Sequence, residues 1–156
     1  EKVITTDISE YRLKMAEEMG ATQALDATQD IKSKIKELNE ERMPDVIIVC
    51  TGALPAVEQA LDCVGPGTTV IFFAVPKPGI DLPIPINKYW RNEVTITTSY
   101  GAAPEDLDES YEWIKSQEID VVDLISHRFP LSQVGKAFKI VCEADESMKV
   151  ILEPSK

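Results

Sequence analysis

The chain has 156 residues, of which 44% are hydrophobic and 28% are charged, and its formal net charge is -11. This size and composition are typical of one globular domain with a substantial core. The acidic balance argues against nucleic-acid and anionic-membrane partners, because both need clustered Lys and Arg. No apolar run approaches the roughly 20 residues of a membrane span and no signal-peptide pattern occurs, so a cytoplasmic location is expected.

Strand and helix signals alternate along the first hundred residues, which predicts an α/β unit with a parallel sheet. The run DVIIVC at residues 45–50 is the clearest strand, and its lack of alternation predicts that both of its faces are covered. Residues 76–85 contain four prolines and are expected to form an extended surface connection. The expected strands are 3–6, 24–26, 45–50, 69–75 and 95–101, and the expected helices are 8–19, 31–38 and one that begins near Pro55.

The pattern changes after Pro104, where a proline followed by several acids predicts the start of a helix. Two further strands, 125–130 and 148–152, and a helix capped by Ser132 complete the expected elements. The stripe that the helix after Pro104 is expected to bury consists of Leu107, Tyr111 and Ile114.

The three cysteines, Cys50, Cys63 and Cys142, are widely spaced. Their odd number and the lack of C-x-x-C pairs argue against a disulfide framework and against a zinc-ribbon site. Reduced and mostly buried thiols are therefore expected. The single histidine, His127, has no second His or Cys near it at ligand spacing, so it is assigned no catalytic or metal-binding role.

Asp7 closes the first expected strand, VITTD, directly before a helix. At the carboxyl end of a parallel strand, its carboxylate could accept hydrogen bonds from both hydroxyls of an adenosine ribose and repel the 2'-phosphate of NADP. Equally, it could be a helix N-terminal acid beside the capping residue Ser9. Methyltransferases that bind S-adenosylmethionine use a similarly placed acid, so Asp7 alone does not name the cofactor. A dinucleotide fold also places a glycine loop roughly twenty residues upstream of this acid, and only six residues precede Asp7.

Other candidate residues occupy related positions. Arg12, one turn into the helix, could reach the same ribose, although an isolated arginine is more often a solvated surface residue. Thr51 and Gly52 follow the strand at 45–50, in the crevice where open α/β sheets bind ligands. Gly52 could permit close approach of the backbone to a ligand, or it could serve the turn alone. Residues 74–76, AVP, hold the same kind of position after the next strand.

Seven sequence blocks in one order carry a family resemblance: VITTD, EYRLKMAEEMGA, DVIIVCTGALPAVEQAL, GTTVIFFAVPKPG, RNEVTITTSYGA, ISHRFPLSQVGKAF and KVILEP. Together they resemble the C-terminal half of a medium-chain, zinc-dependent alcohol dehydrogenase of the sorbitol and threonine dehydrogenase type. The resemblance covers essentially the whole chain. It implies a partial NAD-binding domain with a Rossmann-type doubly wound sheet at residues 1–101, and a C-terminal segment that returns to the catalytic domain at residues 102–156.

The resemblance also implies residue roles. Asp7 would bind the adenosine ribose and favour NAD, Arg12 would contact the same ribose, and Lys149 would approach the pyrophosphate. Residues 85–100 resemble the region through which family members pair, which implies a homodimer or homotetramer. The residues implied to lie beneath the riboses and beside the nicotinamide carboxamide are Thr51, Gly52, Ala74, Val75 and Ser99.

The zinc ligands and the proton relay of the family lie mainly in its N-terminal half. No catalytic or metal-binding residue is therefore assigned in this chain, and the zinc would be held outside it. The first strand and the glycine loop of the cofactor domain are unmatched as well, and in the strand order 3-2-1-4-5-6 that first strand is the middle of the sheet. The chain alone is expected to be inactive and not to fold stably, because open strand edges and exposed apolar faces would remain.

The expected function is therefore that of the C-terminal part of an NAD-dependent, zinc-dependent alcohol or polyol dehydrogenase. Such an enzyme transfers a hydride between a secondary alcohol and NAD. Two alternatives stay open: a zinc-free quinone or enoyl reductase of the same superfamily, and a non-catalytic nucleotide-binding or dimerisation remnant. A methyltransferase is a more distant third, and the residues do not name the alcohol.

Overall fold

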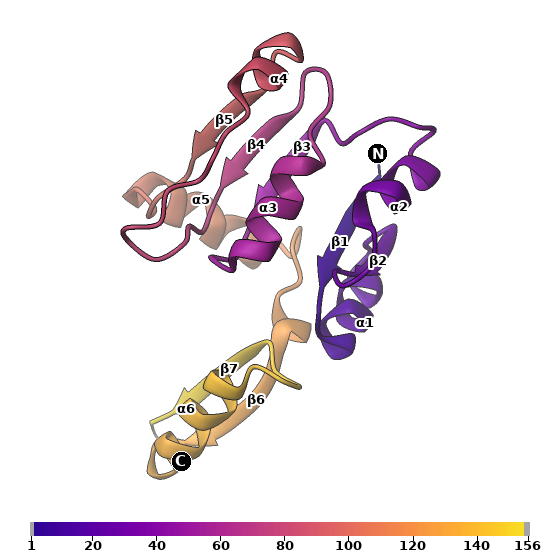
Figure 1. Ribbon diagram of the computed structural model, residues 1–156. Coiled ribbons are helices and arrows are strands. Elements are labelled where there is room, and N and C mark those ends of the chain that lie inside the picture. Colours follow the sequence, from indigo (N-terminus) through magenta and orange to yellow (C-terminus); the bar gives the residue numbers. More distant parts are fainter. Residues whose placement is uncertain (1, 155–156) are drawn as a thin grey trace. The chain divides into compact units, whose positions relative to one another are not determined.

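A computed structural model of the chain describes residues 2–154, and it confirms the predicted α/β class with parallel strands (Figure 1). The chain divides into two compact units. One is Ala27–Gly101, and the other joins the residues up to Asp26 with those from Ala102 onward. The predicted assignment of residues 1–101 to a cofactor domain and of residues 102–156 to a C-terminal segment stays a prediction.

The unit Ala27–Gly101 is a three-stranded parallel sheet with the order β3-β4-β5. The strands run in register, so that Val49, Phe72 and Thr98 lie level at their carboxyl ends. Its elements are α2 (Ile31–Leu38), β3 (Val46–Val49), α3 (Leu54–Asp62), β4 (Thr69–Phe72), α4 (Ile86–Arg91) and β5 (Thr95–Thr98).

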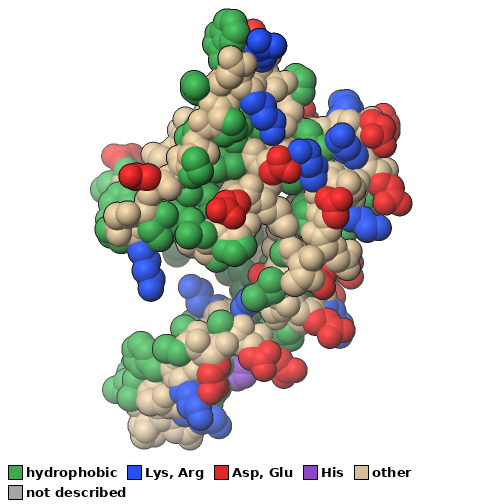
Figure 2. Space-filling model, in the orientation of Figure 1, with side chains coloured by type: hydrophobic (Ala, Val, Ile, Leu, Met, Phe, Trp, Pro, Cys, Tyr) green, Lys and Arg blue, Asp and Glu red, His purple; other side chains and the backbone are tan. Residues whose placement is uncertain are grey.

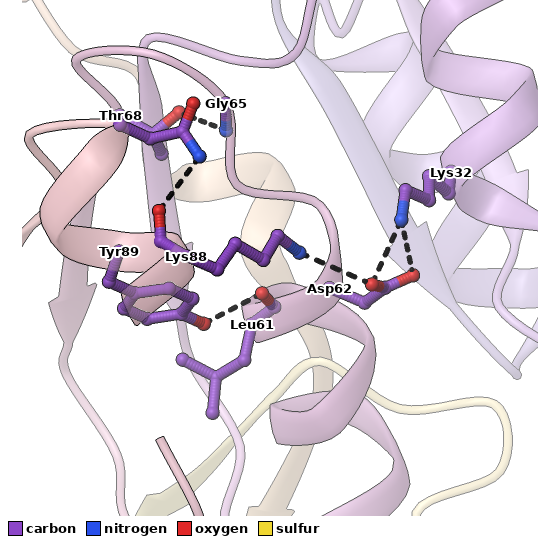
Figure 3. Close-up of polar contacts among 8 residues, drawn as sticks. Lys32, Leu61, Asp62, Gly65, Thr68, Lys88 and Tyr89 are labelled. Carbon is purple, nitrogen blue, oxygen red and sulfur yellow. Dashed lines mark hydrogen bonds and ion pairs between the residues drawn. The ribbon is translucent and has the colours of Figure 1, made fainter. Parts of the chain in front are cut away.

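The core of this unit lies between α3 and one face of the sheet (Figure 1). Val57 of α3 and Val70 of β4 are fully buried, and Phe72 packs in the same cluster. Tyr89 of α4 joins this cluster, and its hydroxyl donates a 2.7 Å hydrogen bond to the carbonyl of Leu61 at the end of α3 (Figure 3). The carboxyl end of α3 is thereby fixed to α4.

A second set of polar contacts ties three helices of the unit to one carboxylate. Asp62, at the end of α3, accepts a 2.9 Å ion pair from Lys32 of α2 and lies 3.6 Å from the ammonium of Lys88 of α4 (Figure 3). The two lysines lower the pKa of Asp62, the bond from Lys32 having the largest effect. Because all three side chains are exposed, the contribution of these pairs to stability is small.

The other face of β3 is open. Val46 and Ile48 are 53% and 59% exposed, whereas Ile47 and Val49 face the core. The prediction that both faces of β3 are covered is therefore wrong for the described residues. Figure 2 shows hydrophobic side chains at the surface of the part of the molecule that contains this sheet.

The other unit contains two pairs of parallel strands, β1 with β2 and β6 with β7. Gly20, with φ +100°, follows α1 at the predicted stop of that helix. Its elements are β1 (Ile4–Asp7), α1 (Glu10–Glu18), β2 (Gln23–Asp26), α5 (Pro104–Lys115), the 3-10 turns η1 (Val122–Leu124) and η2 (Leu131–Gln133), β6 (Ile125–Pro130), α6 (Val134–Glu143) and β7 (Lys149–Glu153).

Several local predictions are wrong. The expected stripe of α5 is exposed, since Leu107 and Tyr111 are each 62% exposed and no residue of the helix is buried. Ser132 lies inside the turn η2 and does not cap α6. The cysteines are unpaired as expected, but among the three only Cys63 is buried. The connection after β4 also contains α4, which was not predicted.

The strands of the described residues form three separate sheets. No ladder joins β1-β2 to β3-β4-β5 within residues 2–154. In the order of a doubly wound sheet, these five strands correspond to strands 2 and 3 and to strands 4 to 6. The predicted break in the sheet at the position of the first strand is thus confirmed.

Candidate functional site

The carboxyl ends of β3, β4 and β5 form one edge of their sheet, because the three strands are parallel. The amide of Ala74 donates to the carbonyl of Val49 over 2.9 Å, and the amide of Ser99 donates to the carbonyl of Phe72 over 3.0 Å. With these two bonds, hydrogen bonding between the neighbouring chains continues beyond the ends of the strands. They bring five predicted residues to this edge: Thr51, Gly52, Ala74, Val75 and Ser99.

Gly52 is required by a close approach of two loops. A Cβ atom at this position would overlap the carbonyl oxygen of Val75 and lie 3.1 Å from its carbonyl carbon. Gly52 does not have a positive φ, so the turn itself does not demand glycine. The loops after β3 and β4 therefore meet through their backbones, in the crevice where parallel sheets bind ligands.

Thr51 supports the start of the next helix. Its hydroxyl accepts a 3.2 Å hydrogen bond from the amide of Ala53, the residue before α3. Thr51, Gly52, Val75 and Ser99 are exposed, so their backbone groups are accessible along the edge. A sheet edge of this kind offers main-chain donors and acceptors to a flat polar group such as an amide.

Asp7 ends β1, and both oxygens of its carboxylate are held. The amide of Ser9 donates to Oδ1 over 2.9 Å, and Nε of Arg12 donates to Oδ2 over 2.9 Å. Partial burial would raise the pKa of Asp7, but these bonds outweigh it and keep the pKa below its usual value. Asp7 is therefore an oriented, ionised acceptor at the carboxyl end of a parallel strand.

The role at the helix start that was considered for Asp7 and Ser9 occurs in the structure. The hydroxyl of Ser9 accepts from the amide of Arg12 over 3.3 Å, which makes Ser9 the cap of α1. Each carboxylate oxygen has two lone pairs, so the bonds from Ser9 and Arg12 leave Asp7 with further acceptor capacity. Serving the helix start does not prevent Asp7 from binding a ribose.

Arg12 and Lys149 line the same shallow pocket, of about 350 Å³. Nη1 of Arg12 also donates to the carbonyl of Ala144 over 2.8 Å, so the guanidinium joins the pocket to Asp7. Two cationic side chains next to an ionised carboxylate could interact with an anionic group and a hydroxyl group of the same ligand. The residues that line the pocket are Arg12, Leu124, Val141, Ala144, Ser147, Met148 and Lys149.

The eight predicted residues thus form two groups on different units. Asp7, Arg12 and Lys149 make the first, and the five residues at the edge of β3-β4-β5 make the second. Sequence reasoning missed Ala144, because a carbonyl acceptor carries no side-chain signal. Within residues 2–154, no group of three or more His, Cys, Asp or Glu side chains could hold a metal ion. His127 stacks on Phe129 and bonds to Ser126.

A family model described as zinc-binding dehydrogenase matches residues 2–116. This chain belongs to that family. The predicted resemblance to this family is confirmed. No helix among the described residues is long and apolar enough to cross a membrane.

Similar proteins cover almost the whole chain. A sorbitol dehydrogenase from Halalkalibacterium halodurans is 29% identical over 97% of this chain and 45% of its own length. An L-threonine 3-dehydrogenase from Escherichia coli O157:H7 is 29% identical over 96% of this chain and 43% of its own. The crystal structure of an alcohol dehydrogenase from Thermotoga maritima superimposes with a TM-score of 0.86 at 25% identity, over 97% of this chain and 43% of its own. The chain thus spans less than half the length of these relatives.

Proposed function

We propose that this chain supplies the NAD-binding part of an alcohol or polyol dehydrogenase. The family and the two similar dehydrogenases support this class of reaction, in which a hydride moves between a secondary alcohol and NAD. The observation that carries the proposal is Asp7, an ionised carboxylate oriented by Ser9 and Arg12 at the end of a parallel strand.

The fold alone does not choose between the two nicotinamide cofactors. Among structures with the same fold, a dehydrogenase from Escherichia coli is complexed with NADH, and a zinc-binding dehydrogenase from Sinorhizobium meliloti is bound to NADP. Their identities to this chain are 21% and 23%. The choice is therefore left to side chains at the ribose, where Asp7 would accept from both hydroxyls of NAD and repel the 2'-phosphate of NADP.

Each of the two groups of residues, taken within its own unit, suits one part of the cofactor. Asp7 and Arg12 would hold the adenosine ribose, and Lys149 would neutralise the pyrophosphate from the same pocket. The close approach of Gly52 to Val75 forms a backbone edge on which the nicotinamide end would lie, with Thr51, Ala74 and Ser99 beside it. When bound, NAD supplies the hydride acceptor, and the residues of this chain would orient the cofactor.

Zinc does not fit the described residues, since no cluster of suitable ligands occurs among them. We therefore derive no step of the reaction through zinc and assign this chain no catalytic residue. A zinc-dependent reaction would need ligands from outside the chain.

A homo-oligomer is part of the proposal. The strand β5 has one unpaired edge, and all four of its residues are exposed. Beside it lies a groove of about 550 Å³ with apolar walls, and an open strand edge next to an apolar groove suits a second copy of the same surface. The residues that line the groove are Ile84, Ile86, Tyr89, Trp90, Glu93, Val94 and Ile96.

The test is the cofactor preference of Asp7→Ala in the protein that carries this chain. Calorimetric titration is expected to show NAD affinity reduced about 10- to 100-fold, because hydrogen bonds to a charged acceptor contribute about 1.5 to 3 kcal/mol. NADP affinity should be unchanged or higher, since a repelling charge is gone. The control is Asp81→Ala, which removes an exposed carboxylate from a loop of the other unit. An unchanged ratio of NAD to NADP affinity in Asp7→Ala would contradict the proposal.

A further inference from the structure

Arg12 connects the predicted ribose acid to a segment more than a hundred residues away in the sequence. Its Nε donates to Oδ2 of Asp7 over 2.9 Å, and its Nη1 donates to the carbonyl of Ala144 over 2.8 Å. The planar guanidinium can make both bonds at once because its donors form a rigid fork. Arg12 is about one quarter exposed, so the bridge is partly shielded from water.

Ser9 makes a second connection to the same place. Its amide donates to Oδ1 of Asp7 over 2.9 Å, and its hydroxyl donates to the carbonyl of Asp145 over 3.3 Å. Ala144 ends α6 in a left-handed conformation, with φ 49°, and its amide donates to the carbonyl of Ile140. The two consecutive carbonyls of this turn therefore point to the residues that orient Asp7.

The turn continues directly into the residue predicted to approach the pyrophosphate. Between Asp145 and Lys149, Ser147 is buried, with 7% of its surface exposed. The amide of Met148 donates to the hydroxyl of Ser126 over 3.0 Å. Residues 144–149 thus form a short, well-bonded segment, and Lys149 and Arg12 line one pocket. A displacement of the turn would move Lys149 as well.

We propose that Arg12 is a positioning residue that couples Asp7 to residues 144–149, so that the ribose acid and Lys149 bind a dinucleotide as one unit. The proposal rests on the proposed function, because it takes a dinucleotide as the ligand. Coupling between two parts of a site is reciprocal. Binding of the ribose at Asp7 therefore stiffens the turn at Ala144, and a stiff turn holds Lys149 beside the pyrophosphate.

The test is a double-mutant cycle with Arg12→Lys and Lys149→Gln, measured as NAD affinity in the protein that carries this chain. Arg12→Lys keeps the charge and loses the fork. If the two residues act independently, the two losses in affinity multiply to within about twofold. The proposal predicts that the loss of NAD affinity in the double variant is at least threefold smaller than that product. Either single change already breaks the link between Asp7 and Lys149.

Hydrogen exchange of the peptide that covers residues 144–149 provides the second measurement. Without cofactor, Arg12→Lys should speed exchange there, and NAD should slow it in the wild type but not in the variant. The control Arg128→Lys alters an exposed arginine of the same unit that pairs with Glu153, and it should leave both readouts unchanged. The coupling would be overturned if the two losses of NAD affinity multiplied in the double variant and if Arg12→Lys left hydrogen exchange of residues 144–149 unchanged. If the wild type bound no NAD, the proposed function would fail, and exchange in the cofactor-free protein would still decide the link.

Discussion

At the scale of single residues, burial and hydrogen bonding set the chemistry of the ionisable groups in different directions. Asp7 is only partly buried and is bonded to Ser9 and Arg12, so its pKa is lowered and it stays ionised at neutral pH. Cys63 is 3% exposed, and burial together with the charge of Asp62 raises the pKa of its thiol to about 11. The carboxylate of Asp7 is thus an ionised hydrogen-bond acceptor, whereas the thiol of Cys63 is unreactive.

Slow alkylation of the Cys63 thiol is predicted from its burial and its raised pKa. A shift from 9.0 to about 11 lowers the thiolate fraction near pH 8 about 100-fold, and burial adds a barrier to access. With iodoacetamide at pH 8, Cys63 in the folded protein that carries this chain should react at least about 100-fold more slowly than in urea, as followed by mass spectrometry. Cys142, which is exposed, is the internal control and should react at similar rates in both. Equal native rates for the two thiols would contradict the burial of Cys63.

Some residues of the candidate site could be predicted from the sequence, and others could not. Asp7 and Gly52 could be singled out because an acid at a strand end and a glycine after a strand have definite physical uses. The reason for Gly52 could not be predicted, because it depends on the carbonyl of Val75, which lies in another loop. The contact from Arg12 to Ala144 could not be predicted either, since any residue type supplies a backbone carbonyl.

At the scale of elements, buried strands were predictable and exposed faces were not. Runs such as residues 45–50 and 69–75 contain the observed β3 and β4, because apolar residues without breaks favour strands. The short helix α4 was missed, since it follows Pro85 and buries only Tyr89. The stripe of α5 was predicted as buried because periodicity identifies an apolar face but not whether an element covers it.

The prediction at this scale concerns the groove beside β5. Trp90 is 73% exposed on the wall of this groove, so a charge there should interfere with pairing and leave the core intact. Trp90→Glu should lower the oligomeric state of the protein that carries this chain, measured by sedimentation velocity. Gln29→Glu adds the same charge at another exposed position of the same unit and should have no effect. A Trp90→Glu variant that keeps the wild-type mass would exclude this groove as the interface.

At the scale of the whole molecule, the described strands form three sheets instead of one. This break was predictable from the strand order that the resemblance implied, because the first strand of that order lies in the middle. The division after Asp26 was not predictable. It depends on contacts of the chain after β2 with α3, such as the 3.0 Å bond from Gln59 to the carbonyl of Ala27, and no local pattern reports them.

The isolated 156-residue chain is predicted to lack a cooperative thermal transition. Separate sheets leave open edges on β1 and β3, and Val46 and Ile48 remain exposed, while each buried unpaired backbone group would cost about 1 to 3 kcal/mol. Circular dichroism and calorimetry of the chain without any partner are the measurements. A sharp two-state melt with equal calorimetric and van't Hoff enthalpies would contradict this expectation.

Asp7 is proposed to bind the adenosine ribose of NAD, and the sharpest test of this role is a crystal structure of the protein that carries this chain with NAD bound. The predicted result places both ribose hydroxyls within about 2.6 to 3.2 Å of the Asp7 carboxylate, with Arg12 still bonded to Oδ2. The nicotinamide end should lie along the backbone of Ala74 and Val75. A dinucleotide whose adenosine ribose binds away from Asp7 would exclude this role of Asp7.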